Sequence, residues 1–466
     1  MKKHISILPL MLLALIAASI LPSCSSKDSD DARDLLLSIP SDASMVGIAD
    51  LHEVLEKAGC DIDGTEIKPG KEFSEAIGKS GSDLGRIFRL ITEGGIDPSV
   101  AAIFLEGYNF YIAGFVADPD LFRETVEKEF GEKFADSGEV SVCGNVALSG
   151  SRFWVCLSSR NTIRPDDIRH FINLTEKQSI ISNKKAAALE KLSHHIQGWG
   201  DIKGCLAAAG LDFASRATAM MALEAMYADP AEFLWELDFE KGELEGELSV
   251  FNTKGGVARF LYPVAKIDAD AIRSLSTNSD ALFAIAISPE TVRMLREETK
   301  TKGVSMLGIL AGALGCVDGT CVYSGDIDKN VNGFLSTTGS GTADISDILS
   351  SYGLKVTKEG KLLRFASGLP SGRITPDEAA TLLKGAVAGA IFSGRLLSDK
   401  GRSTSFSCAA VKLVPEKGGL QLDFTVASAD KGRNILLSIL SAETKTPALK
   451  PAAQTPAVKT EDNENR

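Results

Sequence analysis

Six carboxylates alternate with apolar residues along one short stretch of the chain. They are Glu236, Asp238 and Glu240 before a turn, and Glu243, Glu245 and Glu247 after it. Successive side chains of a β-strand point to opposite faces, so this pattern predicts a hairpin with all six carboxylates on one face. Such a face could attract Ca²⁺ or a basic partner. A solvated outer face explains the same pattern, and both interpretations stay open.

Two cysteines, Cys316 and Cys321, flank the dipeptide Asp318-Gly319. Asp-Gly favours a two-residue hairpin turn, which would place Cys316 opposite Cys321 where paired Cα atoms approach most closely. A disulfide in this exported chain and two buried thiols are the alternatives. The spacing is weak support for zinc, because no second cysteine pair and no histidine lies nearby.

The chain contains no complete catalytic motif. His194 and His195 follow a helical stretch, and adjacent helical residues point about 100° apart, so we expect a solvated helix end rather than two metal ligands. Ser182 begins an S-x-x-K pattern like that of penicillin-recognising enzymes, but its partner motifs are missing and a helix-capping role is expected. We therefore assign no catalytic residue, no metal and no cofactor, and lean against an enzyme.

The first 24 residues have the layout of an export signal. Lys2 and Lys3 precede an apolar run from residue 5 to residue 21, which is short for a membrane-spanning helix of about 20 residues. The run ends in Leu21-Pro22-Ser23-Cys24, which resembles the lipobox of bacterial lipoproteins. This resemblance implies that residues 1–23 are a signal peptide and that Cys24 is lipidated, giving the chain a membrane anchor. The alternative is a secretory signal with an incidental cysteine.

Polar segments flank the part of the chain that we expect to fold. Residues 24–34 read as an acidic leash, and Lys27 followed by acidic residues resembles the surface-export signal of Bacteroides-type lipoproteins. A solvated spacer is the alternative. We predict an outer-membrane lipoprotein exposed at the cell surface. Residues 442–466 are rich in Pro, Lys and Thr, and predict a disordered tail.

The remaining chain is predicted to form two similar lobes, at residues 35–255 and 270–440. Each begins with a Ser-Asp-Ala turn, at 41–43 and 279–281, followed by an apolar strand and a helix start at Asp50 or Ser288. Each closes with a hairpin, and the second copy keeps the apolar alternation of the first with only one acid, Asp423. Because hairpins dominate the connections, we expect an α+β fold with mainly antiparallel sheets and flanking helices.

The lipobox, the leash and the opening Ile39-Pro40-Ser41-Asp42-Ala43 together resemble uncharacterised lipoproteins of Bacteroides-type bacteria, a domain of unknown function. The second opening departs from this pattern, with Thr277-Asn278 in place of Ile39-Pro40. The resemblance implies a protein class and a location, and brings no activity with it.

Composition narrows the function further. The chain has 466 residues with 62 acidic against 50 basic side chains, which argues against a nucleic-acid partner. We expect a lipid-anchored envelope lipoprotein with a non-enzymatic binding or scaffold role, whose one assigned partner is the membrane. Two alternatives stay open. One is a surface hydrolase whose site is assembled from distant residues, and the other an accessory subunit of an outer-membrane nutrient-uptake complex.

Overall fold

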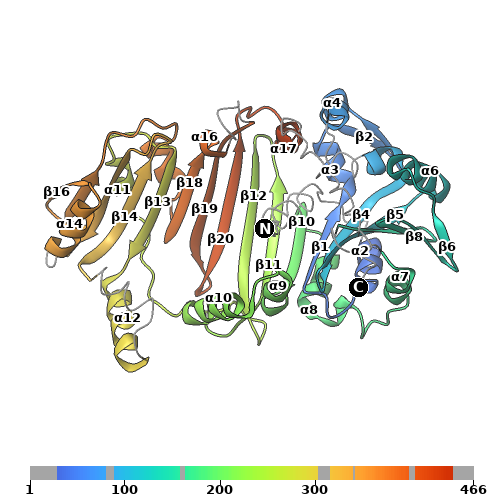
Figure 1. Ribbon diagram of the computed structural model, residues 1–466, viewed down its shortest axis with the longest axis horizontal. Helices are drawn as coiled ribbons and strands as arrows, with labels where there is room; N and C mark the ends of the chain where they lie inside the picture. The colour runs from blue at the N-terminus through green and yellow to red at the C-terminus, as the bar shows by residue number, and fades with distance from the viewer. Residues whose placement is uncertain are drawn as a thin grey trace, which may run out of the picture.

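A computed structural model describes residues 29–79, 89–157, 163–302, 315–338, 342–397 and 405–443. Within these residues, an 18-stranded antiparallel sheet extends along the long axis of the molecule, with helices on its faces and edges (Figure 1). The expected α+β class with mainly antiparallel strands is confirmed. No described helix is long and apolar enough to cross a membrane.

The first half of the sheet is built from strands before residue 253. Its strands are β1 (Met45–Asp50), β4 (Ile96–Glu106), β5 (Asn109–Val116), β6 (Ala135–Ser137), β7 (Val140–Cys143), β8 (Val146–Ser149), β9 (Arg152–Cys156), β10 (Ile196–Asp201), β11 (Pro230–Phe239) and β12 (Glu243–Asn252). The hairpin of β2 (Cys60–Asp63) and β3 (Glu66–Pro69) is separate. The helices are α2 (Ser29–Leu37), α3 (Leu51–Lys57), α4 (Lys71–Lys79), α6 (Pro119–Phe130), α7 (Pro165–Ile172), α8 (Lys184–Ala187), α9 (Ile202–Ala208) and α10 (Phe213–Met226), with 3₁₀ turns Ile180–Ser182 and Ala188–Glu190.

The second half of the sheet is built from strands after residue 265. Its strands are β13 (Ala281–Ile287), β14 (Val317–Gly325), β15 (Val331–Thr337), β16 (Lys355–Glu359), β17 (Leu362–Ala366), β18 (Ala388–Ser393), β19 (Phe406–Glu416) and β20 (Gly419–Ser428). Its helices are α11 (Ala269–Arg273), α12 (Pro289–Lys302), α14 (Thr342–Ser351), α15 (Pro376–Leu382), α16 (Gly394–Leu397) and α17 (Ile435–Glu443).

The two halves meet where β12 pairs with β20, from Glu243 opposite Ala427 to Ser249 opposite Gln421. Outward from this contact the first half runs β12, β11, β10, β1, β4, β5, and the second runs β20, β19, β18, β13, β14, β15. Figure 1 shows β19, β20, β12 and β11 side by side at the centre of the molecule. The sheet therefore passes from residues 35–255 to residues 270–440 without a break.

Local sequence explains where the helices begin. The carboxylate of Asp50 accepts the His52 N–H at 2.8 Å and caps α3, as expected from the sequence. Helix α12 starts at Pro289, directly after the expected Ser288, whose hydroxyl accepts the Thr291 N–H at 3.1 Å.

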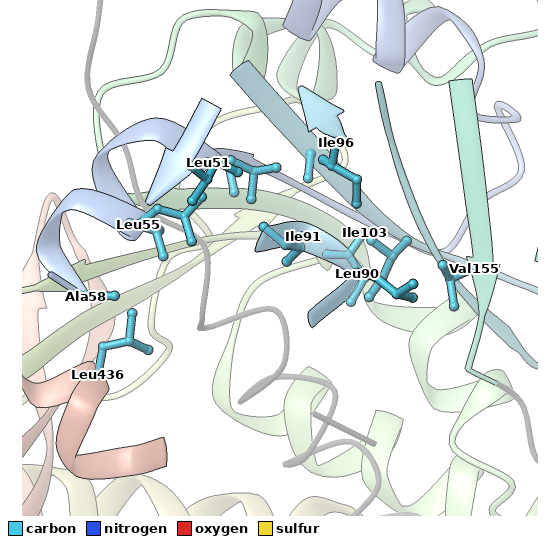
Figure 2. Close-up of a cluster of buried hydrophobic side chains, with 14 of the residues drawn as sticks. Leu51, Leu55, Ala58, Leu90, Ile91, Ile96, Ile103, Val155 and Leu436 are labelled. Atoms are coloured by element: carbon cyan, nitrogen blue, oxygen red, sulfur yellow. The ribbon is translucent and has the colours of Figure 1, made fainter. Parts of the chain in front are cut away.

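One hydrophobic core lies between the first half of the sheet and α3, α6 and α17. Figure 2 shows Leu51, Leu55 and Ala58 with Ile103 of β4, and Leu436 of α17 close to Ala58. The last described helix thus packs on the first half, which corrects the assignment of residues 435–440 to the second lobe. It also extends to residue 443, so the part of the predicted tail beyond that point lies outside the described residues.

The other face of the sheet carries two further cores, one in each half. In the first half, α2 and α7 cover Trp154 and Trp199, and in the second half α11 and α15 cover Leu282 and Phe334. Residues 29–34 of the predicted leash belong to α2, where Ala32 is fully buried. The leash prediction is wrong for those residues, because an apolar stripe of α2 has sheet to pack against.

Candidate functional site

Among the described residues, helices leave one face of the second half of the sheet largely uncovered. Ala284 and Val322 are register partners on β13 and β14, and both pack into the core under α11 and α15. Their neighbours Phe283 and Tyr323 are also register partners and therefore point to the opposite face. The side chains of Phe283 and Tyr323 remain 44% and 46% exposed.

Four aromatic rings form a row across this open face. The ring centroid of Phe283 lies 5.4 Å from that of Phe392 and 6.2 Å from that of Tyr323, which in turn lies 6.5 Å from that of Phe365. Gly333 of β15 lies between Tyr323 and Phe365 in the register, and a Cβ there would come within 2.5 Å of the Phe365 ring. Glycine at this position lets the aromatic row continue across β15.

A hollow of about 570 Å³ opens on the aromatic row. Its lining is almost wholly apolar, and includes Ile285, Leu335, Leu349 of α14, Val411 and Leu422. Lys412 is the one charged lining residue among those described, and its Nζ lies 3.7 Å from an Asp423 carboxylate oxygen. A concave apolar surface of this volume is typical of sites for small apolar ligands. We call the aromatic row and this hollow the apolar site.

The predicted acidic hairpin is confirmed on β11 and β12. Glu236 lies opposite Glu247 and Asp238 opposite Glu245, while Glu240 and Glu243 lie where the strands meet at the turn. Like charges directly opposite each other destabilise a sheet unless counter-charges are nearby. We call these six carboxylates the acidic face. Within the described residues, no cluster of His, Cys, Asp and Glu side chains could hold a metal ion there or elsewhere.

The histidine pair, His194 and His195, contacts these acids. His194 Nε2 lies 3.0 Å from a Glu236 oxygen, and its Nδ1 lies 2.9 Å from Asp238 Oδ2. His195 is 7% exposed, and its backbone N–H donates to Asp238 Oδ1 at 3.1 Å. The expectation of a solvated helix end is wrong, because the segment before β10 folds onto β11 and carries both rings to the acids.

The tautomer of His195 decides which bond its ring makes. Nδ1 lies 3.0 Å from the Phe239 backbone N and 2.8 Å from Asp238 Oδ1. Without a proton, Nδ1 accepts the Phe239 N–H, and with a proton it can donate to Asp238 instead. His195 Nε2 lies 3.9 Å from a carboxylate oxygen of Glu53, in the first turn of α3.

The surroundings shift the pKa values of these groups. Burial alone would raise the pKa of Asp238, but hydrogen bonds from His195 and His194 outweigh it and hold that pKa well below 3.8. Burial would lower the pKa of His194, but the hydrogen bond to Asp238 and the charge of Glu236 raise it above 6.5. Burial, followed by the charges of Asp423 and Glu236, raises the pKa of Glu247. The cluster therefore stabilises an imidazolium between two carboxylates.

The expected hairpin between Cys316 and Cys321 is wrong. Residues 317–325 form one strand, β14, which pairs with β13 on one side and β15 on the other and accommodates Asp318-Gly319 as an irregularity. Both side chains are thiols rather than a disulfide. Burial raises the pKa of the Cys321 thiol to about 12, which keeps it protonated and unreactive.

The remaining candidates from the sequence are Ser182 and Cys24. Ser182 ends a 3₁₀ turn, and Asn183 rather than Ser182 caps α8 by accepting the Lys185 and Ala186 N–H groups. Cys24 and the signal sequence lie outside the described residues. The apolar site was missed by sequence reasoning, because Leu282–Ile287 has the continuous apolar pattern of a strand buried on both faces.

Comparisons with known proteins provide no family for this chain. No family model matches it, and no curated protein matches it. Among solved structures, crystal form I of TP0453 shares 11% identity over 74% of this chain and 95% of that chain, with a TM-score of 0.30. Crystal form III of TP0453 shares 10% identity over 74% and 96% of the two chains, with a TM-score of 0.29. At these TM-scores the likeness establishes neither fold nor function.

Proposed function

We propose that this protein is a lipid-anchored, non-enzymatic lipoprotein of the cell envelope that binds a small apolar ligand at the apolar site. The observation that carries the binding role is the exposed aromatic row above a hollow of about 570 Å³. Soluble proteins seldom leave a contiguous apolar surface open without a use for it. A hollow of this size falls within the range of about 300–1,000 Å³ found for small-molecule sites.

The lining favours an apolar ligand over a sugar. Sugars stack on aromatic rings but also need several polar groups to match their hydroxyls. Here Phe283, Phe365 and Phe392 offer no hydrogen bond and Tyr323 offers a single hydroxyl, while the ammonium of Lys412 is already near Asp423. A ligand with an acyl chain or a similar hydrocarbon body suits this lining better, because it needs few polar partners.

A binding assay tests the apolar site. We expect the neutral fluorescent probe N-phenyl-1-naphthylamine to bind the protein saturably and to be displaced by palmitate. Ile285→Lys places a charge beside the aromatic row, and Phe283→Ser removes a ring from it. Losing about 1–2 kcal/mol of apolar contact should weaken probe binding by about 5- to 30-fold.

Tyr108→Ser is the matched control, because Tyr108 is an exposed aromatic residue at the β4–β5 turn of the first half. Its probe affinity should equal that of the unchanged protein. Probe binding that is equally strong in Phe283→Ser, Ile285→Lys and the control would contradict a ligand at this site.

The proposed location rests on the sequence of the N-terminal segment. The lipobox ending in Cys24 and the following Lys27 with its acidic neighbours support an outer-membrane lipoprotein at the cell surface. Metabolic labelling with palmitate should mark the unchanged protein and leave Cys24→Ser unlabelled. Protease added to intact cells should degrade the anchored protein, whereas full protection would contradict surface exposure.

We also propose that the two halves are related copies of one plan, as their sequence echo suggests. Support comes from the matching strand orders on either side of the β12–β20 contact. A helix follows the central strand of each half, α3 after β1 and α12 after β13. On this proposal the two copies diverged, so that the first half acquired the acidic face and the second half acquired the apolar site.

A further inference from the structure

A second and larger hollow lies between the turn of the acidic hairpin and α15. Its volume is about 1190 Å³, and it shares no lining residue with the apolar site. Cys408 of β19 and Ala427 of β20 are register partners among its lining residues. Four cations also line it, namely Lys241, Arg373, Arg395 and Lys431. We call this hollow the cationic groove, which is unexpected in a chain with a net charge of −12.

Two of the cations are brought together by a tight backbone contact. The Gly242 carbonyl accepts the Ser428 N–H at 2.6 Å, and the Gly242 N–H donates to the Arg433 carbonyl at 3.0 Å. A Cβ on Gly242 would lie 2.9 Å from the Lys431 Cα. The glycine therefore lets the hairpin turn with Lys241 pack directly on the segment with Lys431, so that two like charges share one rim.

The two arginines are organised by a fully buried carboxylate. Asp280 is 0% exposed, and its oxygens accept the Ser393 hydroxyl at 2.7 Å and the Arg373 backbone N–H at 3.3 Å. An Asp280 oxygen also lies 3.2 Å from Arg395 Nη1. Asp280 thus fixes the guanidinium of Arg395 and the backbone of Arg373 in the wall of the groove, which lowers the entropy lost when a ligand binds there.

Most acids of the groove already have other partners. Asp377 lies 3.4 Å from Arg273 Nε, and Glu378 accepts the Thr375 N–H and hydroxyl in the capping box of α15. Glu243 is the remaining acid of the lining. By contrast, no ion pair within the described residues engages the side chains of Lys241, Arg373 or Lys431. Three of the four cations of the groove therefore stand outside any ion pair of the described residues and can meet an incoming anion.

We propose that the cationic groove binds a small polyanion bearing two or more phosphate or carboxylate groups. Arginine side chains recognise both oxyanions through paired N–H donors, and the two lysines of the same lining neutralise further charge. This inference is independent of the proposed function, because the groove and the apolar site have separate linings and separate ligands.

Isothermal titration of the folded protein with pyrophosphate and with citrate tests the groove. We expect saturable binding of at least one, weakened by added salt. Binding of pyrophosphate alone identifies phosphate as the recognised group, and binding of citrate alone identifies carboxylate. The variant Lys241→Gln/Arg373→Gln/Lys431→Gln should bind at least about tenfold more weakly. These side chains are exposed, so the variant keeps the fold.

Lys128→Gln is the matched control, an exposed lysine of α6 in the first half, and its affinity should not change. A second readout is the rate at which N-ethylmaleimide labels Cys408, measured by mass spectrometry. A bound anion should slow this labelling. The proposal is overturned if neither anion binds saturably, or if the triple variant and the control bind with equal affinity. Failure of the apolar probe to bind would bear on the proposed function alone.

Discussion

Replacing Asp238 by Asn should destabilise the protein in a pH-dependent way. The substitution keeps the shape of the side chain, and Oδ1 can still accept the His195 N–H. It removes the charge that faces His194 Nδ1 at 2.9 Å. A hydrogen bond to a charged group contributes about 1.5–3 kcal/mol, but both side chains are about one-third exposed, so screening reduces this to about 1–2 kcal/mol.

The signs of the two pKa shifts set the pH window. The pKa of His194 is raised in the folded protein, so its contribution is complete below 6.5 and is lost as pH rises through the folded value. The pKa of Asp238 is lowered, so its contribution is present above 3.8 and is lost as pH falls through the folded value. The contact between the two therefore contributes most between about pH 4 and 6.5.

Urea unfolding followed by tryptophan fluorescence measures this effect. The free energy of unfolding of Asp238→Asn should fall by about 1–2 kcal/mol at pH 5.5 and by less than about 1 kcal/mol at pH 9. Relief of repulsion between Asp238 and Glu245 is similar at both pH values, so the difference reports on the contacts of Asp238 with the histidine pair.

Asp423→Asn is the matched control, because it removes a carboxylate that faces a lysine, Lys412, rather than a histidine. Its deficit should be equal at both pH values. A deficit in Asp238→Asn that does not change with pH, or one that changes as much in the control, would refute the assigned role of His194.

Two further predictions concern packing and the thiols. Gly198→Ala should lower the free energy of unfolding by about 1–3 kcal/mol or more, because the new Cβ would lie 2.2 Å from the Trp235 ring. Gly256→Ala, whose nearest neighbour would be 3.6 Å away, should leave the urea midpoint nearly unchanged. Alkylation of the unreduced, unfolded chain should label both Cys316 and Cys321. A peptide in which neither residue is labelled, with a mass two hydrogens below that of the reduced peptide, would show a disulfide instead.

Several elements could be predicted from sequence because their signals are local. Asp118 caps α6 and Pro119 opens it, and Gly131 ends it in the left-handed conformation with φ of 70°. The alternation around the turn at Gly242 predicted β11 and β12, because each strand has one buried and one polar face. Such patterns depend on residues within a few positions of one another.

The errors arose where a distant segment changed the surroundings. Asp318-Gly319 would favour a turn in isolation, but pairing with β13 and β15 keeps β14 extended through it. His194 and His195 follow a helical stretch and would be solvated there, yet both contact Asp238, which lies 44 and 43 positions later in the chain. In each case tertiary pairing outweighed the local preference.

The sequence by itself determined the α+β class, the hairpins and the expectation of a lipid anchor at Cys24, because periodicity, caps and signal segments are read from neighbouring residues. The tertiary structure alone decided that β12 joins β20, that the described helices leave the apolar site uncovered and that four cations meet in one groove. Apolar alternation shows that a strand has a buried face, but only the packing of helices decides which face is covered.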